Sequence, residues 1–254
     1  MKTIHIRASR EYDVCIGAGL LGECGERIAA AAPGAEKAVV YTDTTVYPLY
    51  ARRVTDSLKN AGFTVLEDYF LAGEGSKTLR SWERILRFLA EHRVTRSDVV
   101  VALGGGVVGD MVGFAAACYQ RGVRFVQIPT TLLAAVDSSV GGKTAVDLPM
   151  GKNLAGAFWQ PSLVLCDTDT LQTLPPPVWR GGCAEIIKYG VLDGETLFSR
   201  LEKSLPDEVS EEILARCVEL KRDIVAGDEF DTGARRLLNL GHTAAHAAEL
   251  LSDY

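Results

Sequence analysis

The stretch "DVVVALGGGVVGD", Asp98 to Asp110, joins an apolar, β-branched run to a cluster of glycines. A short apolar run that ends in glycines predicts a strand buried on both faces, which is typical of a parallel sheet. The glycines at 104, 106 and 109 fit the pattern G-x-G-x-x-G, in which a tight turn leads from a strand into a helix. This stretch therefore predicts a central strand of an α/β fold and the start of the helix that follows it.

The segments on either side repeat this alternation. Strand-like runs are "KAVVYT", "FTVLED", "VRFVQIP" and "SLVLCD", while "VYPLYARRVTDSLKNAG" and "SKTLRSWERILRFLAEHR" carry apolar residues at helical spacing. Strands that alternate with helices predict a parallel sheet covered by helices on both faces. We assign this α/β domain to residues 1–174.

The character of the sequence changes at three consecutive prolines, Pro175 to Pro177, which prevent a helix or strand from continuing through them. The later segments "CAEIIKYGVL", "ETLFSRLEKSL", "EEILARCVELKRDIVAGDE" and "ARRLLNLGHTAAHAAELL" all carry helical patterns. We therefore predict a second, α-helical domain over residues 175–254.

Composition excludes several classes of protein. The chain has 254 residues, 47% of them hydrophobic, which is enough to bury a core. Its net charge of −6 argues against nucleic-acid and anionic-membrane partners, since both need a basic face, and still allows a small anionic substrate in a local basic pocket. The N-terminus "MKTIHIRASR" lacks the apolar core of a signal peptide, and Asp110 interrupts the nearest candidate for a membrane span. The six cysteines stand singly, as expected for buried thiols of a cytoplasmic protein.

The glycine turn has two interpretations, a phosphate site or an ordinary tight turn. A helix that starts after glycines offers free N–H groups and a favourable dipole to a pyrophosphate. A standard Rossmann site also needs an acidic residue at the end of the next strand, but that strand ends "QIPTT". Asp43, at the end of "VVYTD", is the alternative ribose partner. We predict a dinucleotide bound across the strand ends, in a non-standard manner.

The segment "VDSSVGGKTAVDLPMGKN" is the densest polar loop in the sequence. It is not a P-loop, because that motif needs glycine where this chain has Asp137. Lys143 and Lys152, each after a glycine, suit a phosphate or carboxylate, while Asp137 and Asn153 suit hydroxyl groups. An ordinary solvated loop is the alternative, and the apolar flanks of the segment argue against it.

The segment "GGCAEIIKYG" places Glu185 and Lys188 on one face of a helix. The pair is either a surface ion pair or a buried carboxylate, which needs a partner or a metal.

His242 and His246 also share one helical face. Both can reach one metal, or one can ligate while the other acts as an acid or base. Two packed core histidines are the alternative, and the nearby Arg235 and Asn239 favour a functional role.

Together these segments resemble the 3-dehydroquinate synthases, the sugar-phosphate cyclases of the shikimate pathway. The likeness runs almost from end to end. It is densest in "GGGVVGDMVGFAAACYQRGVRFVQIPTTLLAAVDSSVGGKTAVDLPMGKNLAGAFWQP", "GGCAEIIKYG" and "RRLLNLGHTAAHAAE". The resemblance implies an N-terminal α/β domain that binds NAD, a helical domain that carries the metal, and an active site between them.

The resemblance also implies roles for individual positions. Zinc or cobalt would be held by Glu185 and His242, together with a histidine from a later motif. The implied NAD contacts are Asp43, Thr44, Thr45, Glu74, Gly75, Ser76, Lys77, Gly105, Gly106, Val107, Asp110, Thr130, Thr131, Lys152, Thr170, Leu171, Gln172 and Thr173. The implied substrate and catalytic residues are Asp137, Lys143, Asn153, Lys188, Lys221, Asp231, Arg235, Asn239 and His246, with Arg121 reaching the substrate of a partner subunit in a homodimer.

The implied activity converts a small phosphorylated sugar acid, 3-deoxy-D-arabino-heptulosonate 7-phosphate, to 3-dehydroquinate and phosphate. NAD transiently oxidises the C5 hydroxyl, phosphate is eliminated, the hydride returns, and the ring opens and closes again by an aldol step. Zinc serves as the Lewis acid, and the protein is a carbon–oxygen lyase.

Three departures from the family pattern bear on this expectation. Asp231 stands where the family has a glutamate, Ala245 stands where it often has glycine, and the sequence ends at Tyr254 before the third histidine. Residues 1–254 alone are therefore expected to show little turnover, because a catalytic zinc normally needs three protein ligands. The alternatives are another sugar-phosphate cyclase, a related polyol dehydrogenase that yields net NADH, or an inactive NAD-binding fragment.

Overall fold

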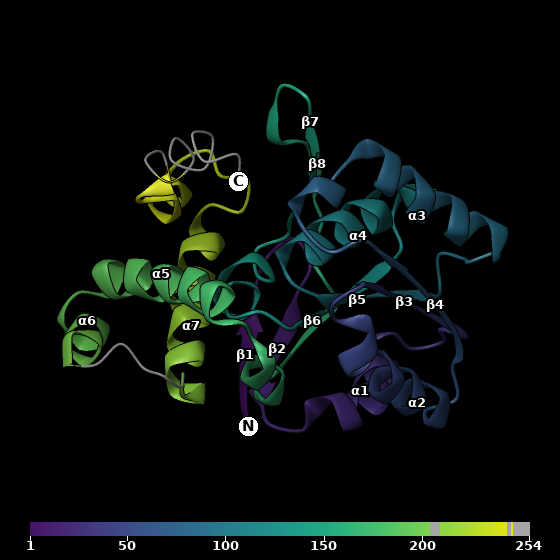
Figure 1. Cartoon of the computed structure of the whole chain (residues 1–254), viewed down its shortest axis with the longest axis horizontal. Helices are drawn as coiled ribbons and strands as arrows, with labels where there is room; N and C mark the ends of the chain where they lie inside the picture. Colours follow the sequence, from purple (N-terminus) through teal and green to yellow (C-terminus); the bar gives the residue numbers. More distant parts are fainter. Residues whose placement is uncertain (204–208, 243–244, 246–254) are drawn as a thin grey trace.

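The computed structural model describes residues 1–203, 209–242 and 245, and a seven-stranded sheet dominates it (Figure 1). The sheet order is β1-β2-β9-β6-β5-β3-β4. Its strands are β1 (Lys2–Ile6), β2 (Tyr12–Gly17), β3 (Lys37–Asp43), β4 (Thr64–Phe70), β5 (Val99–Gly104), β6 (Arg124–Pro129) and β9 (Leu163–Asp167). Neighbouring strands are parallel, apart from the antiparallel pair β1 and β2. The predicted α/β fold with a mostly parallel sheet is confirmed.

Strand β5 shows why the sheet is covered on both faces. Val99, Val101 and Leu103 pack into one apolar core with α1 (Cys24–Ala31) and α2 (Arg52–Asn60). The alternating residues Val100 and Ala102 pack into another with α3 (Leu79–Glu91) and α4 (Gly106–Cys118). Figure 1 shows the two helix pairs on opposite sides of the sheet. The uninterrupted apolar run in the sequence follows from this double burial.

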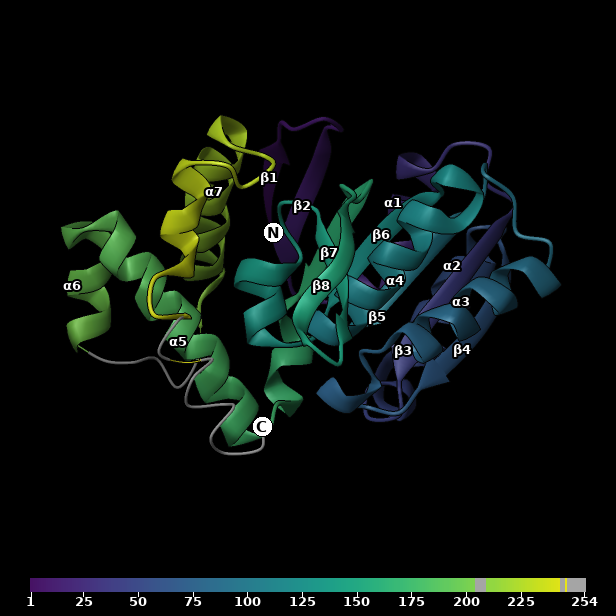
Figure 2. The same cartoon turned by 90° about the horizontal axis from the view of Figure 1, so that it is seen from above.

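The helical part begins at the prolines, as predicted. Pro176 and Pro177 form the first turn of α5 (Pro176–Asp193), where a missing N–H costs nothing. Helices α6 (Glu195–Lys203) and α7 (Glu211–Gly227) follow. A third apolar core joins these helices to β1 and β2, so the helical part packs against that edge of the sheet (Figure 2). The division into two domains at residue 175 stays a prediction.

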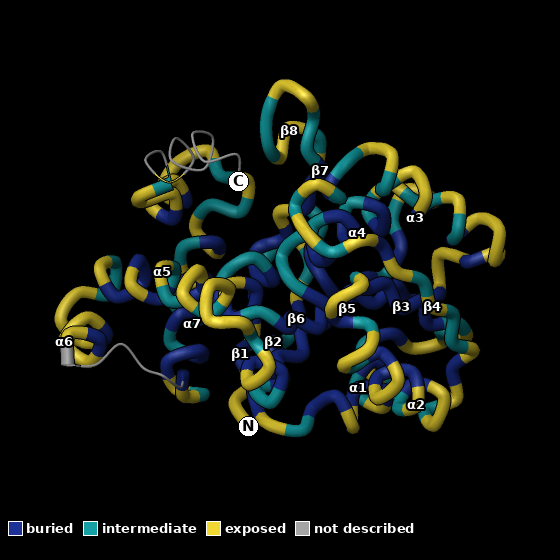
Figure 3. The backbone as a smooth tube through the Cα atoms, in the orientation of Figure 1, coloured by how far each residue is buried: buried dark blue, intermediate teal, exposed yellow. Residues whose placement is uncertain are grey.

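The segment predicted as a polar loop forms a β-hairpin instead. Strands β7 (Lys143–Leu148) and β8 (Gly151–Phe158) pair antiparallel and project from the sheet (Figure 1). Gly156 allows the close pairing, because a Cβ there would lie 2.1 Å from the carbonyl oxygen of Thr144. The tip of the hairpin is exposed (Figure 3). The prediction of an irregular loop was wrong because lysine, aspartate and glycine masked a short alternating strand pattern.

The helix predicted from residue 234 onward is also interrupted. A short turn, η7 (Ala234–Asn239), ends at Leu240, and Gly241 follows with φ of 84°. A left-handed residue ends a helix, and glycine adopts that conformation at little cost. Apart from His242 and Ala245, the rest of that predicted helix lies outside the described residues.

Short helical turns connect the main elements. They are η1 (Leu20–Gly22), η2 (Tyr47–Ala51), η3 (Glu74–Ser76), η4 (Tyr119–Arg121), η5 (Ala134–Ser138) and η6 (Thr168–Thr173). Across residues 1–203 and 209–242, no helix is both long and apolar enough to cross a bilayer.

Candidate active site

A cavity of about 570 Å³ lies where the β7–β8 hairpin, η5 and the helical part meet. Residues far apart in the sequence converge here because η5 follows β6, while α7 and η7 approach from the helical side. The polar side chains of the lining are Asp110, Asp137, Ser138, Lys143, Thr144, Asn153, Lys221, Arg235, Asn239 and His242. The structure thus brings most of the predicted substrate residues to one place.

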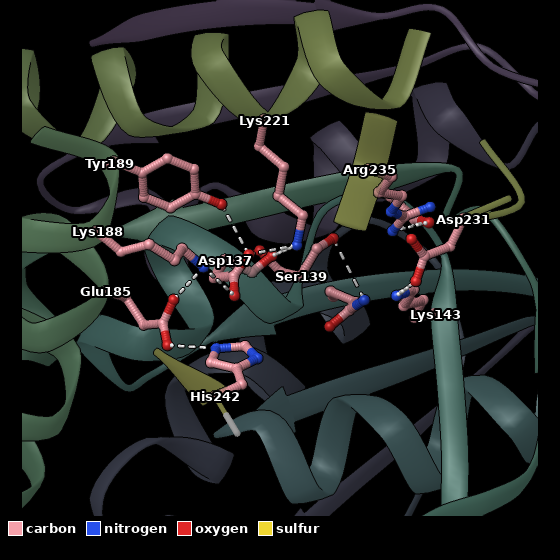
Figure 4. A network of polar contacts seen from close by, with 12 residues as sticks. Asp137, Ser139, Lys143, Glu185, Lys188, Tyr189, Lys221, Asp231, Arg235 and His242 are labelled. Atoms are coloured by element: carbon pink, nitrogen blue, oxygen red, sulfur yellow. Dashed lines mark hydrogen bonds and ion pairs between the residues drawn. The ribbon is translucent and has the colours of Figure 1, made fainter. Parts of the chain in front are cut away.

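Asp137 lies at the centre of this cluster (Figure 4). Its Oδ1 accepts hydrogen bonds from Lys221 Nζ at 2.5 Å and from the Tyr189 hydroxyl at 2.8 Å. Its Oδ2 lies 3.5 Å from Lys188 Nζ. Burial opposes the charge of Asp137, but the two ammonium groups and the hydrogen bonds outweigh it, so the pKa of this carboxyl lies well below its usual range. Asp137 is therefore a stable carboxylate at neutral pH.

Glu185 and His242 form the second part of the cluster (Figure 4). Glu185 Oε1 lies 3.3 Å from His242 Nε2, and Glu185 Oε2 accepts a hydrogen bond from Lys188. The side chains of Glu185 and Lys188 are 15% and 5% exposed, so their pair is buried, as one of the two sequence interpretations required. In the described part of the chain, no three histidine, cysteine or acidic side chains gather as a metal site. His246 lies outside the described residues.

The rim of the cavity is held by residues that follow α7. Arg235 is 1% exposed, and its guanidinium donates to the carbonyl oxygens of Gly141 and Glu229. Asp231 Oδ2 lies 2.5 Å from Lys143 Nζ at the base of the hairpin. Asp231 is a rim residue that pairs with Lys143, and the cavity lining does not include it.

Lys77 lines a second cavity of about 880 Å³, together with Glu74 and Lys152. Its Nζ donates to Asp110 Oδ2 at 2.6 Å and to Asn153 Oδ1 at 2.5 Å. Asp110 and Asn153 line the first cavity, so Lys77 links the two spaces. Sequence analysis assigned these residues to a cofactor and a substrate without indicating that they touch.

Most of the residues predicted to contact a dinucleotide follow the carboxyl ends of parallel strands, along one edge of the sheet, whereas Lys152 lies in β8. Asp43 ends β3, Thr130 follows β6, and η6 follows β9. The carboxyl ends of parallel strands share an edge, where open α/β sheets bind ligands. Asp43 accepts the N–H groups of Thr45 and Val46 through Oδ1 alone. In the described part of the chain, Thr130 Oγ1 is buried without a partner.

Arg121 is not brought to this site. It is exposed at the end of α4 opposite the glycine turn, with a left-handed φ of 63°. Its predicted role involves a partner subunit and stays a prediction.

Besides Ser138 and Thr144 of the cavity lining, Tyr189 is a site residue that sequence analysis did not identify. Its position next to Lys188 was visible, but a tyrosine among apolar helical residues is typical of a core. Its contact with Asp137 joins residues 52 positions apart in the sequence.

Comparison with known proteins places the chain in a family. Residues 69–180 match the family model of the 3-dehydroquinate synthase N-terminal part, and residues 182–254 match that of the C-terminal part. The chain belongs to the 3-dehydroquinate synthase family. A 3-dehydroquinate synthase of Desulforamulus reducens is 47% identical over 261 residues, covering 100% of this chain and 72% of that protein.

Solved structures extend the comparison to relatives with bound ligands. A 2-deoxy-scyllo-inosose synthase complexed with carbaglucose-6-phosphate, NAD⁺ and Co²⁺ has a TM-score of 0.84 at 26% identity, covering 98% of this chain and 71% of that one. A 2-epi-5-epi-valiolone synthase of Streptomyces hygroscopicus with NAD⁺ and Zn²⁺ bound has a TM-score of 0.76 at 28% identity, covering 94% and 68%. Both relatives hold NAD⁺ together with a divalent metal.

Proposed function

We propose that this protein is a 3-dehydroquinate synthase that acts on 3-deoxy-D-arabino-heptulosonate 7-phosphate in the cytoplasm. The supporting observation is the cavity in which Asp137, Lys221 and Arg235 converge, in a chain of this family. The product is 3-dehydroquinate, released with phosphate, which makes the protein a phosphate-eliminating lyase.

The charges of the cavity suit this substrate. Lys143, Lys221 and Arg235 are three cations around one space, and the substrate carries a phosphate and a carboxylate. Lysine and arginine bind such groups through charge-assisted hydrogen bonds. Asp137 has no donor to offer in its ionised form, so it accepts a substrate hydroxyl instead.

The glycine turn fits a dinucleotide. The N-terminus of α4 has no side-chain cap, which leaves its N–H groups for a ligand. A Cβ at Gly105 would lie 3.0 Å from Thr131 Cγ2, and one at Gly106 would lie 3.2 Å from Ser138 Oγ, so the turn packs tightly against the residues after β6. The NAD contacts are then the residues at this edge of the sheet.

Glu185 and His242 fit a divalent cation. One carboxylate oxygen and one imidazole nitrogen already face each other, and this donor pair suits zinc or cobalt. When bound, NAD and the cation would supply transient oxidation of the C5 hydroxyl and Lewis-acid polarisation of the substrate oxygens.

The remaining residues position charge and protons. Lys188 holds Glu185 and Asp137 together, and Asn153 is oriented by Lys77. Asp231 is the candidate proton acceptor, with Oδ2 on Lys143 and a buried Oδ1 without a partner in the described structure. Arg121 would contact the substrate that is bound to the second subunit of a homodimer.

Substrate choice tests the proposal. The full-length gene product that contains this sequence is supplied with NAD and Zn²⁺, and phosphate release is measured with two sugar phosphates. We expect turnover of 3-deoxy-D-arabino-heptulosonate 7-phosphate. Turnover of sedoheptulose 7-phosphate alone would identify another sugar-phosphate cyclase, and no turnover of either would support an inactive NAD-binding protein.

A further inference from the structure

Tyr189 is a fully buried residue of α5 whose hydroxyl faces the candidate site (Figure 4). Its ring packs in the core that joins the helical part to the sheet. Its hydroxyl donates to Asp137 Oδ1 at 2.8 Å. The core thus fixes one end of the side chain, and the other end contacts a residue of the cavity lining.

The two oxygens of Asp137 are used differently. Oδ1 accepts from both Tyr189 and Lys221, whereas the contact of Oδ2 with Lys188 is longer, at 3.5 Å. An ionised carboxylate has about four acceptor positions, two on each oxygen. The acceptor positions that these contacts leave open therefore lie mainly on Oδ2.

The tyrosine is the rigid member of this arrangement. Lys188 and Lys221 carry their ammonium groups on four-carbon stems with more torsions, and each ammonium also binds a second acceptor, the Glu185 carboxylate and the Asp137 carbonyl oxygen respectively. The Tyr189 hydroxyl is fixed by a buried ring with only two side-chain torsions. Among the donors to Asp137, the tyrosine has the fewest side-chain torsions, and it holds Oδ1.

We propose that Tyr189 is a positioning residue for the reaction, which holds the Asp137 carboxylate so that Oδ2 accepts a hydroxyl of the phosphorylated sugar acid. The proposal rests on the proposed function, because it assumes that this substrate occupies the cavity. Tyr189 itself does not touch the substrate.

The variant Tyr189→Phe isolates the hydroxyl. It keeps the aromatic ring. The contact between this ring and Lys188 is therefore also kept, in which Nζ lies 4.8 Å from the ring centroid. We expect the dissociation constant for the heptulosonate phosphate to rise about tenfold, because the Asp137 carboxylate, no longer fixed before binding, must then be ordered when the substrate binds. The measurement is calorimetric titration of the full-length gene product saturated with Zn²⁺ and NADH, because NADH cannot oxidise the substrate and the complex therefore does not react.

Two comparisons separate positioning from a structural role. Inorganic phosphate, which offers no sugar hydroxyl, should bind Tyr189→Phe as well as it binds the wild type. Tyr41→Phe is the matched control, because it also removes the hydroxyl of a buried tyrosine that donates to an aspartate. Tyr41 of β3 is 1% exposed, and its hydroxyl donates to Asp68 of β4. That control should leave the affinity for the sugar phosphate unchanged.

The possible outcomes distinguish a positioning role of Tyr189 from a structural role, and both from a failure of the proposed function. If the wild type binds the sugar phosphate and Tyr189→Phe binds it within about twofold, Tyr189 has no positioning role and the proposed function stands. Equal losses of affinity for the sugar phosphate and for inorganic phosphate, or a Tyr189→Phe protein that does not fold, would show a structural role instead. A wild type that does not bind the sugar phosphate refutes the proposed function, and this proposal with it.

Discussion

The buried carboxylate of Asp137 depends on its ammonium partners. Lys221 is 6% exposed and provides the shortest contact to Asp137, at 2.5 Å. Removing one partner of a buried ion pair leaves an uncompensated charge, which costs about 3–5 kcal/mol. We expect Lys221→Met to lower the free energy of unfolding by about that amount, measured by urea denaturation at pH 7.

Lys59 provides the control for this prediction. It is exposed at the end of α2, so Lys59→Met should change the free energy of unfolding by less than about 0.5 kcal/mol. Equal effects of the two substitutions would contradict the account of Asp137.

Sequence analysis identified the charged residues of the site more fully than their partners. Asp137 and Lys143 stood out because glycines and polar residues are unusual between apolar flanks. The pair of Glu185 and Lys188 followed from helical spacing. The contacts of Lys188 and Tyr189 with Asp137 depend on how α5 packs against η5, which no local sequence pattern contains.

At the scale of elements, helix α5 must approach the segment that leads into η5 closely to bring these groups together. A Cβ at Gly182 would lie 2.4 Å from Leu132 Cβ, just before η5, whereas a Cβ at Gly181 would meet nothing within 4 Å. We expect Gly182→Ala to lower the free energy of unfolding by about 1–3 kcal/mol through overpacking and to weaken substrate binding. Urea denaturation and calorimetric titration measure the two effects.

Gly181→Ala is the matched control on the same helix. It should stabilise the protein by up to about 1 kcal/mol, because alanine is the better helix former. If Gly182→Ala were as well tolerated as Gly181→Ala, the close docking of α5 would be wrong.

Asp228 predicts a pH dependence in the segment after α7. It accepts the backbone N–H groups of Thr232, Gly233 and Arg235, which lower its pKa from 3.8 to about 2. A lowered pKa contributes stability that is fully present above pH 3.8 and is lost as the pH falls through about 2. We therefore expect Asp228→Asn to be less stable than the wild type at pH 6, with the difference shrinking between pH 4 and 2.

Urea midpoints of both proteins across this pH range check the prediction. A difference that stays constant down to pH 2 would show that the charge of Asp228 does not contribute.

Two features that sequence analysis missed, the hairpin and the break at Gly241, have different causes. Strands β3, β5, β6 and β9 were predicted because burial on both faces leaves an apolar run. The edge strand β4 is mostly exposed or half-buried and was predicted from the shorter run "FTVLED". The β7–β8 hairpin borders a polar cavity, so its pattern is mixed. The break at Gly241 depends on a left-handed φ that glycine permits without requiring it.

At the scale of the whole molecule, the metal should join parts that lie far apart in the chain. Glu185 belongs to α5 and His242 follows η7, so a cation held by both adds a link between them. Adding Zn²⁺ to the metal-free full-length gene product should raise its melting temperature by about 5 °C, because binding to the folded state alone stabilises it.

The variant His242→Ala should lose most of this shift. His92→Ala removes an exposed histidine of the sheet domain, next to Phe88, and should keep the shift. If His242→Ala kept the full rise in melting temperature, His242 would not be a metal ligand.

The overall arrangement was predictable only in part. Alternation of strands and helices indicated the parallel sheet, and the three prolines marked the start of the helical part. The packing of that part against β1 and β2 was not indicated, because it depends on apolar side chains from segments about 200 residues apart, such as Ile4 and Leu214.

The balance between phosphate and NADH tests the central claim most directly. The full-length gene product is given 3-deoxy-D-arabino-heptulosonate 7-phosphate, Zn²⁺ and NAD at a small fraction of the substrate concentration, while phosphate and the absorbance of NADH are followed together. The account predicts many phosphate ions released for each NAD present, with no lasting accumulation of NADH. Accumulation of NADH in proportion to the substrate consumed, without phosphate release, would contradict it and identify a dehydrogenase instead.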